Sequence, residues 1–431
     1  RPGLIALGGT MTRGRGLVFK KPTSGRLQGT VHWLALGILL VPGSALGQSG
    51  GKMRLSEAEF LATLDSLHPA VVSLASELAR AEGARQSAGA LENPAIEFEY
   101  EAPADQADQS TLKLGWKPPL DGRRGLAVDA GEEAVAAASQ NLEWARLKVR
   151  QDMREVFADW ALAERRKALV GQHLESLREL EARLNVRAER GEESQLTARR
   201  FALALTEVRT EHARSEADLA QSRGNALALR ADLPSDVVAV LPDPPAVPQT
   251  LDGSVRPDVV ALRHEVEETM LRRRLAGRVL EFPTLVAGWT RISLGSVDFD
   301  GPYFGVAWDV PLFNRNQGQR HQMTQSIAIA EARLSLAERE AEQRRSSALI
   351  AYSALHRSLS EIADVVQGAP ELVDAASASF LAGESTMTDL LEILRSVLDS
   401  QLAALELQAG VLAAHRELEL SAGRALTQGE F

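Results

Sequence analysis

Residues 95–117 read AIEFEYEAPADQADQSTLKLGWK, and their pattern differs from that of the long polar stretches around them. Apolar side chains stand at every second position from Ile96 to Tyr100 and from Leu112 to Trp116, with mostly charged residues between them. This period of two predicts β-strands with one apolar and one polar face. We therefore predict a β-hairpin over residues 95–117, with strands of about eight to ten residues, long enough to cross a membrane at a tilt.

The same pattern returns about 190 residues later in the chain. Residues 284–310 alternate again and predict a second hairpin, whose connection we place at Ser293–Pro302. The flanks also match in order: HPAVVSL at 68–74 is echoed by RPDVVAL at 256–262, and PLDGR at 119–123 by PLFNR at 311–315. Several matches at one offset indicate an internal duplication.

Long helices are expected after each hairpin. Residues 123–190 and 317–382 contain little glycine or proline, and about 65 helical residues would make a rod of about 100 Å. Shorter helices are expected over about 55–90 and 191–231, two of them lying end to end beside each rod. Gly368-Ala369-Pro370 should break or bend the second rod, because proline cannot donate to the helical ladder.

These segments give a domain plan. Residues 1–47 combine a basic leader, an apolar run from Val31 to Val41 and small residues before Gln48, which predicts a cleaved signal peptide or, alternatively, an uncut anchor. The first repeat then spans 48–240, with its hairpin at 95–117 and long helices over 123–231. A linker follows at 241–255. The second repeat spans 256–431, with its hairpin at 284–310 and long helices over 317–428.

Composition narrows the possible functions. The 431 residues include no cysteine and carry a formal net charge of −10, which argues against disulfides, thiol chemistry and nucleic-acid binding. The eight histidines are scattered, and no metal-ligand or nucleophile motif appears, so we expect no enzyme activity, no catalytic residue, no metal site and no cofactor.

Four strands cannot close a barrel, and an open sheet edge is not tolerated in lipid. If the hairpins enter a membrane, several chains must combine them, and three chains would supply twelve strands. The alternative is a pair of solvent-facing hairpins packed on helices, which would leave Trp116, Trp289 and Trp308 without an adequate core.

Taken together, the leader, the duplication, the hairpins and the long rods resemble the TolC-like outer-membrane efflux proteins. The most specific motifs are PLFNRNQG at 311–318 and FLAGESTMTDLL at 380–391, which are closest to the subgroup serving heavy-metal resistance pumps. The resemblance implies a mainly α fold with a small membrane β part, namely a homotrimer with a 12-stranded β-barrel in the outer membrane and an α-helical tunnel through the periplasm. It also implies three further partners: a periplasmic adaptor protein, an inner-membrane resistance-nodulation-division pump and outer-membrane lipid.

The resemblance further points to candidate site residues. Asp389 and Glu392 match the position where the family narrows its tunnel with acidic side chains, and threefold repetition would gather about six carboxylates into a cation-attracting gate. Arg199 or Arg200 could pair with them in a closed state. The turns that would meet the adaptor contain Arg190, Gly191 and Glu192 in the first repeat and Gly383, Glu384 and Ser385 in the second.

Two alternatives to a conduit for a proton-driven pump stay open. The same conduit could serve a type I protein secretion system, which the sequence does not distinguish. The chain could instead be a periplasmic coiled-coil adaptor, which predicts an uncleaved leader and soluble hairpins. The cargo is not encoded in any motif, and metal cations are one possibility.

Overall fold

A computed structural model describes residues 53–62, 68–102, 107–234, 236–248, 254–294 and 296–426. The chain divides into two units, Arg1–Gly51 and Lys52–Phe431, and every described residue belongs to the second. The predicted leader at 1–47 and the middle of the predicted linker therefore lie outside the described residues. None of the described helices is long and apolar enough to cross a membrane.

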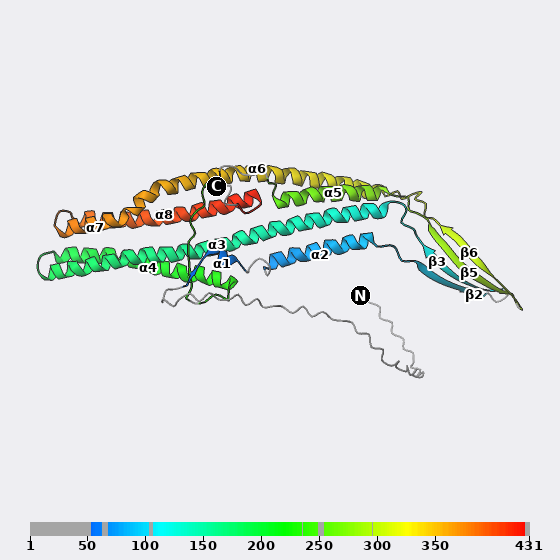
Figure 1. Cartoon of the computed structure of the whole chain (residues 1–431), viewed down its shortest axis with the longest axis horizontal. Coiled ribbons are helices and arrows are strands. Elements are labelled where there is room, and N and C mark those ends of the chain that lie inside the picture. The colour runs from blue at the N-terminus through cyan, green and yellow to red at the C-terminus, as the bar shows by residue number, and fades with distance from the viewer. Residues whose placement is uncertain are drawn as a thin grey trace, which may run out of the picture. The chain divides into compact units, whose positions relative to one another are not determined.

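Helices dominate this unit, and most of them run side by side (Figure 1). They are α1 (Glu57–Leu61), α2 (Pro69–Gly89), α3 (Arg123–Glu189), α4 (Gln195–Leu229), α5 (Pro257–Gly277), α6 (Gln317–Gln367), α7 (Ala369–Leu381) and α8 (Met387–Ala422). The 67 residues of α3 form the first predicted rod, and both α2 and α4 pack along it. In the second half α5 and α8 pack along α6, while α5 also contacts α3 and joins the two halves.

The second rod is interrupted as predicted. Helix α6 ends at Gln367 and α7 begins at Ala369, with Gly368 between them and a proline in the first turn of α7. The shorter helix expected over 55–90 is wrong in its first part. Ser56 and Glu59 form a capping box that starts α1, and α2 begins only at Pro69, since proline lacks the N–H that would continue an earlier helix.

The strands form two sheets. They are β1 (Arg54–Leu55), β2 (Ala95–Glu101), β3 (Asp108–Trp116), β4 (Val238–Ala239), β5 (Thr284–Leu294) and β6 (Val297–Ala307). The large sheet has the order β2-β3-β5-β6 and is antiparallel throughout, so the two predicted hairpins lie next to each other through β3 and β5. The two-residue strands β1 and β4 pair in parallel, which the sequence did not predict.

The connection predicted at Ser293–Pro302 is wrong. Strand β5 continues to Leu294 and β6 already begins at Val297, which lie opposite each other in the register. Pro302 sits within β6, where it lies opposite Trp289. Strand β6 is an edge strand of this chain, and an edge tolerates proline because its outward N–H has no partner in the sheet.

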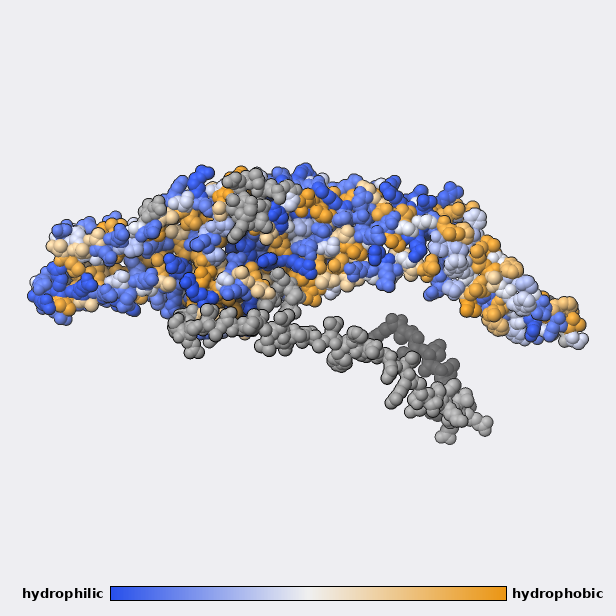
Figure 2. Space-filling view, in the orientation of Figure 1, coloured by the Kyte–Doolittle hydropathy of each residue, from blue (hydrophilic) through white to orange (hydrophobic). Residues whose placement is uncertain are grey.

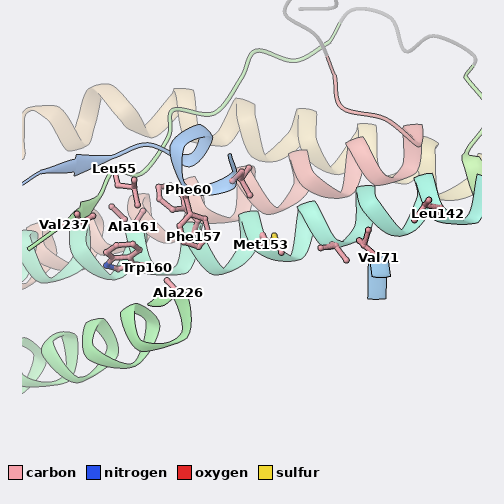
Figure 3. Close-up of a cluster of buried hydrophobic side chains, with 13 residues drawn as sticks. Leu55, Phe60, Val71, Leu142, Met153, Phe157, Trp160, Ala161, Ala226 and Val237 are labelled. Carbon is pink, nitrogen blue, oxygen red and sulfur yellow. The ribbon is translucent and has the colours of Figure 1, made fainter. Parts of the chain in front are cut away.

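The hydrophobic core is distributed along the rods. One cluster surrounds Phe157 and Trp160 of α3 and takes in Phe60 of α1, with ring centroids of Phe60 and Phe157 5.3 Å apart (Figure 3). Leu55 and Val237, beside the small sheet, belong to the same cluster, so β1 and β4 are held by packing. Separate clusters lie at the far end of the rods and between α6 and α8.

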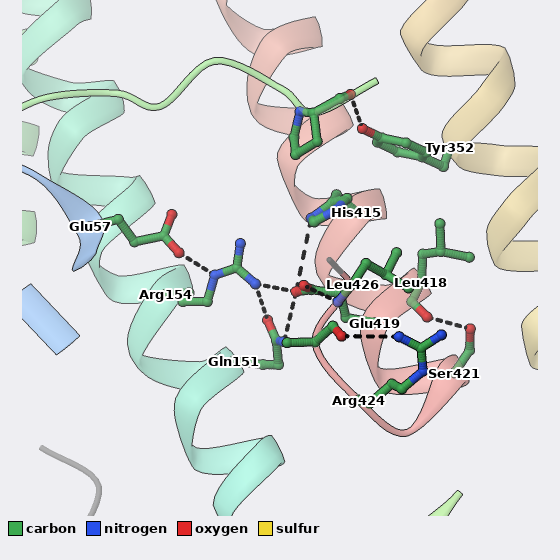
Figure 4. Close-up of polar contacts among 12 residues, drawn as sticks. Glu57, Gln151, Arg154, Tyr352, His415, Leu418, Glu419, Ser421, Arg424 and Leu426 are labelled. Carbon is green, nitrogen blue, oxygen red and sulfur yellow. Dashed lines mark hydrogen bonds and ion pairs between the residues drawn. The ribbon is translucent and has the colours of Figure 1, made fainter. Parts of the chain in front are cut away.

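A buried polar network joins the two halves near the middle of α3 (Figure 4). Arg154 of α3 pairs with both Glu57 of α1 and Glu419 of α8. The Glu419 carboxylate, whose side chain is only 4% exposed, also accepts hydrogen bonds from Gln151 at 2.9 Å and from the backbone N–H of Leu426 at 3.1 Å. A buried charge is tolerated only when paired in this way.

His415 lies beside this network. Its Nδ1 is 3.9 Å from the Glu419 carboxylate, and its ring centroid is 5.4 Å from that of Tyr352 on α6. Burial lowers the pKa of His415, while the negative charge of Glu419 opposes that shift and the positive charges of Arg154 and Arg416 add to it. The histidine therefore favours its neutral form in the folded chain.

Candidate functional site

Two turns lie together at the end of the rods farthest from the large sheet (Figure 1). The first turn, residues 190–194, joins α3 to α4, and the second turn, residues 382–386, joins α7 to α8. Gly191 and Gly383 have φ angles of 76° and 78°, in the left-handed region where a side chain is strained.

Both turns close their helix with the same pair of backbone bonds. In the first turn the Gly191 N–H donates to the Ala188 carbonyl at 3.2 Å, and the Glu192 N–H donates to the Arg187 carbonyl at 2.9 Å. In the second turn the Gly383 N–H donates to the Phe380 carbonyl at 3.0 Å, and the Glu384 N–H donates to the Ser379 carbonyl at 2.9 Å. This Schellman arrangement satisfies carbonyls that the helix end leaves without partners. The duplication is therefore conserved in backbone geometry within the molecule, and not only in residue order.

Hydroxyl groups then start the next helices. Ser194 Oγ accepts the N–H of Leu196 at 3.1 Å, and Thr386 Oγ1 accepts the N–H of Asp389 at 3.2 Å. The Asp389 carboxylate returns the interaction by accepting the Thr386 N–H at 3.0 Å and hydroxyl at 2.7 Å, which completes a capping box. These hydrogen bonds, the one from the hydroxyl first, lower the pKa of Asp389.

Arg187 connects the two turns. Its Nη1 donates to the carbonyl oxygen of Leu381 at 2.6 Å, and its Nε lies 3.8 Å from a carboxylate oxygen of Glu192. Leu381 is the last residue of α7, where carbonyls lack helical partners. One side chain of the first repeat therefore helps to fix where the second turn sits.

Apolar packing supports this end of the molecule. Leu184 of α3, Phe201 of α4, Phe380 of α7 and Leu390 of α8 belong to one buried cluster, so all four helices converge beneath the turns. A shallow, mostly apolar hollow lies on the surface beside them, lined by Ala182, Arg183, Val186, Arg187 and Leu381. This end thus presents rigid turns with apolar surface next to them.

The opposite end carries the large sheet, whose two faces differ. One face is apolar and exposed to solvent in the single chain. Figure 2 shows hydrophobic residues, in orange, at the end of the molecule that carries the sheet. The exposed members of the apolar face are Ile96, Phe98, Leu112, Leu114, Trp116, Leu285, Trp289, Phe304 and Val306, which the register places on the same side.

The other face carries charged and hydroxyl side chains, together with the exposed apolar Ile292 and Phe299. Lys113 pairs with Glu99 of the neighbouring strand, and its Nζ lies 5.8 Å from the ring centroid of Tyr303. The hydroxyls of Thr111 and Thr290 are 3.2 Å apart. Strands β2 and β6 form the two edges, and neither has a second partner among the described residues. The sheet is therefore a four-stranded panel with unlike faces and two open edges.

Glu281 ties this sheet to the helices. Its carboxylate pairs with Lys117, which follows β3, and with Arg123, the first residue of α3, and these hydrogen bonds lower the pKa of Glu281. The Glu281 carbonyl accepts the indole N–H of Trp308 at 3.0 Å. One residue therefore links the ends of strands from both halves to the start of a rod.

Comparison with known proteins agrees with this architecture. Residues 254–424 match the family model described as outer membrane efflux protein. A curated relative, the cobalt-zinc-cadmium resistance protein CzcC of Cupriavidus metallidurans, is 23% identical over 402 residues, covering 82% of this chain and 86% of the relative. An alignment that covers 82% of this chain includes parts of both halves.

Solved structures share the fold of this chain. The structure of CusC matches with a TM-score of 0.69 and 13% identity, over 88% of this chain and 96% of that one. The outer membrane protein VceC of Vibrio cholerae matches with a TM-score of 0.67 and 17% identity, over 85% and 96%. The fold prediction, long helical hairpins with four strands per chain, is confirmed.

The structure describes both residues predicted to form the gate. Asp389 and Glu392 are exposed and stand three residues apart near the start of α8. Neither Arg199 nor Arg200 forms an ion pair with them within the described part of a single chain. The acidic gate stays a prediction.

The role of the two turns in docking on an adaptor is also a prediction. Arg190, Gly191 and Glu192 lie in the first turn, and Gly383, Glu384 and Ser385 lie in the second. The structure links these two groups through Arg187, a residue of the first predicted turn whose contact with Leu381 the sequence did not predict. An arginine in the last turn of a helix is a known signal for carbonyl capping, but its partner here is 194 residues away in the sequence.

Proposed function

We propose that this protein is the channel component of a tripartite efflux system, a passive trimeric conduit that carries metal cations from the periplasm to the exterior. The observation that carries the proposal is the panel-like sheet, apolar on one exposed face, in a chain whose residues 254–424 match the outer membrane efflux protein family model.

The trimer follows from the edges of that sheet. Strands β2 and β6 would expose unpaired backbone groups to lipid, and each such group costs several kcal/mol. Pairing β2 of one chain with β6 of the next removes both edges. Three chains then close a twelve-stranded barrel with the apolar face toward lipid and the polar face, with Lys113 and Glu99, toward the lumen.

The opposite end is suited to docking on a periplasmic adaptor. The two turns are rigid, lie together and have apolar surface beside them, which supports contact with another protein rather than with lipid at this end. A conduit built from one kind of chain has no energy source of its own, so we place a proton-driven inner-membrane pump of the resistance-nodulation-division class behind the adaptor. In the trimer Asp389 and Glu392 would form the acidic ring that narrows the tunnel.

The choice of metal cations as cargo rests on the relative CzcC, whose name states cobalt-zinc-cadmium resistance. The test is deletion of the gene in its host, followed by growth on cobalt, zinc, cadmium, copper, silver and a panel of hydrophobic drugs. We expect sensitivity to the metal cations alone, reversed by the wild-type gene.

Two matched variants connect this phenotype to the sheet. Phe304→Arg places a cation on the apolar face, which costs about 2 to 4 kcal/mol in a bilayer, and should fail to restore resistance. Tyr303→Arg places the same charge on the polar face and should restore it. Drug sensitivity without metal sensitivity would contradict the cargo. Sensitivity to nothing, together with loss of an exported protein, would favour the secretion alternative.

A further inference from the structure

The two connections between the sheet and the long helices are built alike. In each, the N–H of the residue after a proline donates to the carbonyl of the residue before that proline. Leu120 donates to Pro118 and Leu312 donates to Val310, both at 2.9 Å. In each, the residue just before the rod is left-handed, Gly122 before α3 with φ 75° and Asn316 before α6 with φ 55°. Asn316 is the one non-glycine residue with positive φ among the described residues.

These connections are rigid. The Asn314 side chain accepts the N–H of Asn316 at 3.0 Å, and the Gln317 side chain accepts that of Arg315 at 2.8 Å. In the first connection the Asp121 carboxylate accepts the N–H of Arg123 at 3.0 Å. These local hydrogen bonds hold the backbone of both connections in place, and the backbone in turn fixes where the side chains of the connections begin.

What the connections present is apolar. Leu120 is 71% exposed, Leu312 is 64% exposed and Phe313 is 92% exposed. Burial of a phenylalanine or leucine side chain is worth about 1.5 to 3 kcal/mol, so three such side chains held in the open indicate a partner surface. Leu120 lies four residues after the end of β3, and Leu312 and Phe313 lie five and six residues after the end of β6. The apolar face of these strands is also exposed, so exposed apolar side chains extend from the sheet into the connections.

Cationic side chains border this surface. Arg315 and Arg320 are exposed and form no ion pair among the described residues, so their guanidinium groups are available to an anion. Apolar and aromatic side chains together with arginine are the combination that suits the headgroup zone of a membrane, where the apolar part enters the acyl region and the cation meets phosphate.

We propose that residues 118–122 and 310–316 are membrane anchors that insert Leu120, Leu312 and Phe313 into the periplasmic leaflet of the outer membrane at the phospholipid headgroup level. This rests on the proposed function, in which the sheet is embedded. Two other occupants fit less well. A neighbouring copy paired along β6 would reach Phe313, but Leu120 follows β3, an interior strand. The adaptor docks at the opposite end of a rod about 100 Å long.

The absence of cysteine makes the test direct, because each new cysteine is the only one in the chain. Phe313→Cys and Leu120→Cys are labelled with an environment-sensitive fluorophore, and the full-length protein is placed in nanodiscs of phosphatidylethanolamine and phosphatidylglycerol. A fraction of the lipid carries a nitroxide, either on the headgroup or at the end of an acyl chain. We expect the headgroup nitroxide to remove about half of the fluorescence at both positions and to quench more than the acyl-chain nitroxide.

Two further positions separate this inference from the proposed function. Phe98→Cys, in the middle of β2 on the apolar face, should be quenched by the acyl-chain nitroxide, and Leu203→Cys on α4, equally exposed but far from the sheet, by neither. If Phe98 is quenched and Phe313 and Leu120 are not, the anchors are wrong while the embedded sheet stands. If label at Phe313 is shielded from water and from both nitroxides, a neighbouring copy covers it and the inference fails. No quenching at Phe98 would overturn the proposed function itself.

Discussion

The carboxylate of Asp389 has one observed role and one predicted role. It caps the start of α8 through Thr386, and it is also one of the two residues predicted to narrow the tunnel. The hydrogen bonds lower its pKa, so it stays ionised under conditions in which an ordinary aspartate begins to take up protons. Glu392 has no such cap, and the two roles can therefore be separated by substitution.

If Asp389 and Glu392 form a charged ring, removing either charge should reduce cation selectivity. Asp389→Asn and Glu392→Gln each halve the number of ring carboxylates, and we expect the cation-to-anion permeability ratio to fall by about twofold or more. The measurement is the reversal potential of single channels in planar bilayers under a salt gradient. Thr386→Ala is the control, because it removes the cap and leaves both charges. Selectivity that changes with Thr386→Ala and not with the charge variants would assign Asp389 to capping alone.

At this scale the sequence reveals what is local. Gly191 and Gly383 could be predicted as turn residues, because a helix end in the left-handed conformation requires glycine and both stand at equivalent positions. The contact between Arg187 and Leu381 could not be predicted, because it depends on how two hairpins from different repeats pack. Similarly, no pattern in the sequence identifies Glu281 as the residue that links sheet and rods.

At the scale of whole elements, periodicity predicts the long structures and misses the short ones. The rods and hairpins were predictable because their patterns extend over many residues. Strands β1 and β4, with two residues each, are too short to show a period. The two aspartates and the glycine of residues 297–302 favour a turn, yet they form part of an edge strand, because pairing with β5 outweighs their weak strand propensity.

The contact of α3, α6 and α8 around His415 should make stability depend on pH. The ordinary pKa of histidine, 6.5, applies to the unfolded chain, and the folded value is lower because of burial. The unfolded state then binds more protons in the interval between the two values. The contribution of His415 is therefore fully present above pH 6.5 and is lost as the pH falls from 6.5 through the folded value.

We expect His415→Gln to reduce this loss, measured as the midpoint of thermal unfolding in detergent over a series of pH values below 6.5. His321→Gln is the matched control, since His321 is exposed near the start of α6, and its pH profile should follow the wild type. The groups facing His415, namely Glu419, Arg416, Arg154 and Tyr352, are unchanged in both variants. Identical profiles for all three proteins would contradict a role for His415.

At the scale of the whole molecule, the decisive feature is a sheet that a single chain leaves incomplete. Its apolar face and open edges have no covering partner among the described residues, although the helices beside it are well packed. We therefore expect the protein extracted in detergent to have three times the mass of its single chain by native mass spectrometry, and to give single chains after denaturation. A single chain that stays dissolved once detergent is removed would contradict the trimer.

The strand order has one further consequence for assembly. The free edges belong to different repeats, β2 to the first and β6 to the second, so a seam between copies always joins unlike strands, head to tail. Two copies joined at a single seam of this kind still leave one β2 edge and one β6 edge free. Growth stops only when the ring closes on itself, and the curvature of each four-stranded panel thus sets the number of copies. A change that flattens the panel would give open chains of subunits in place of a pore.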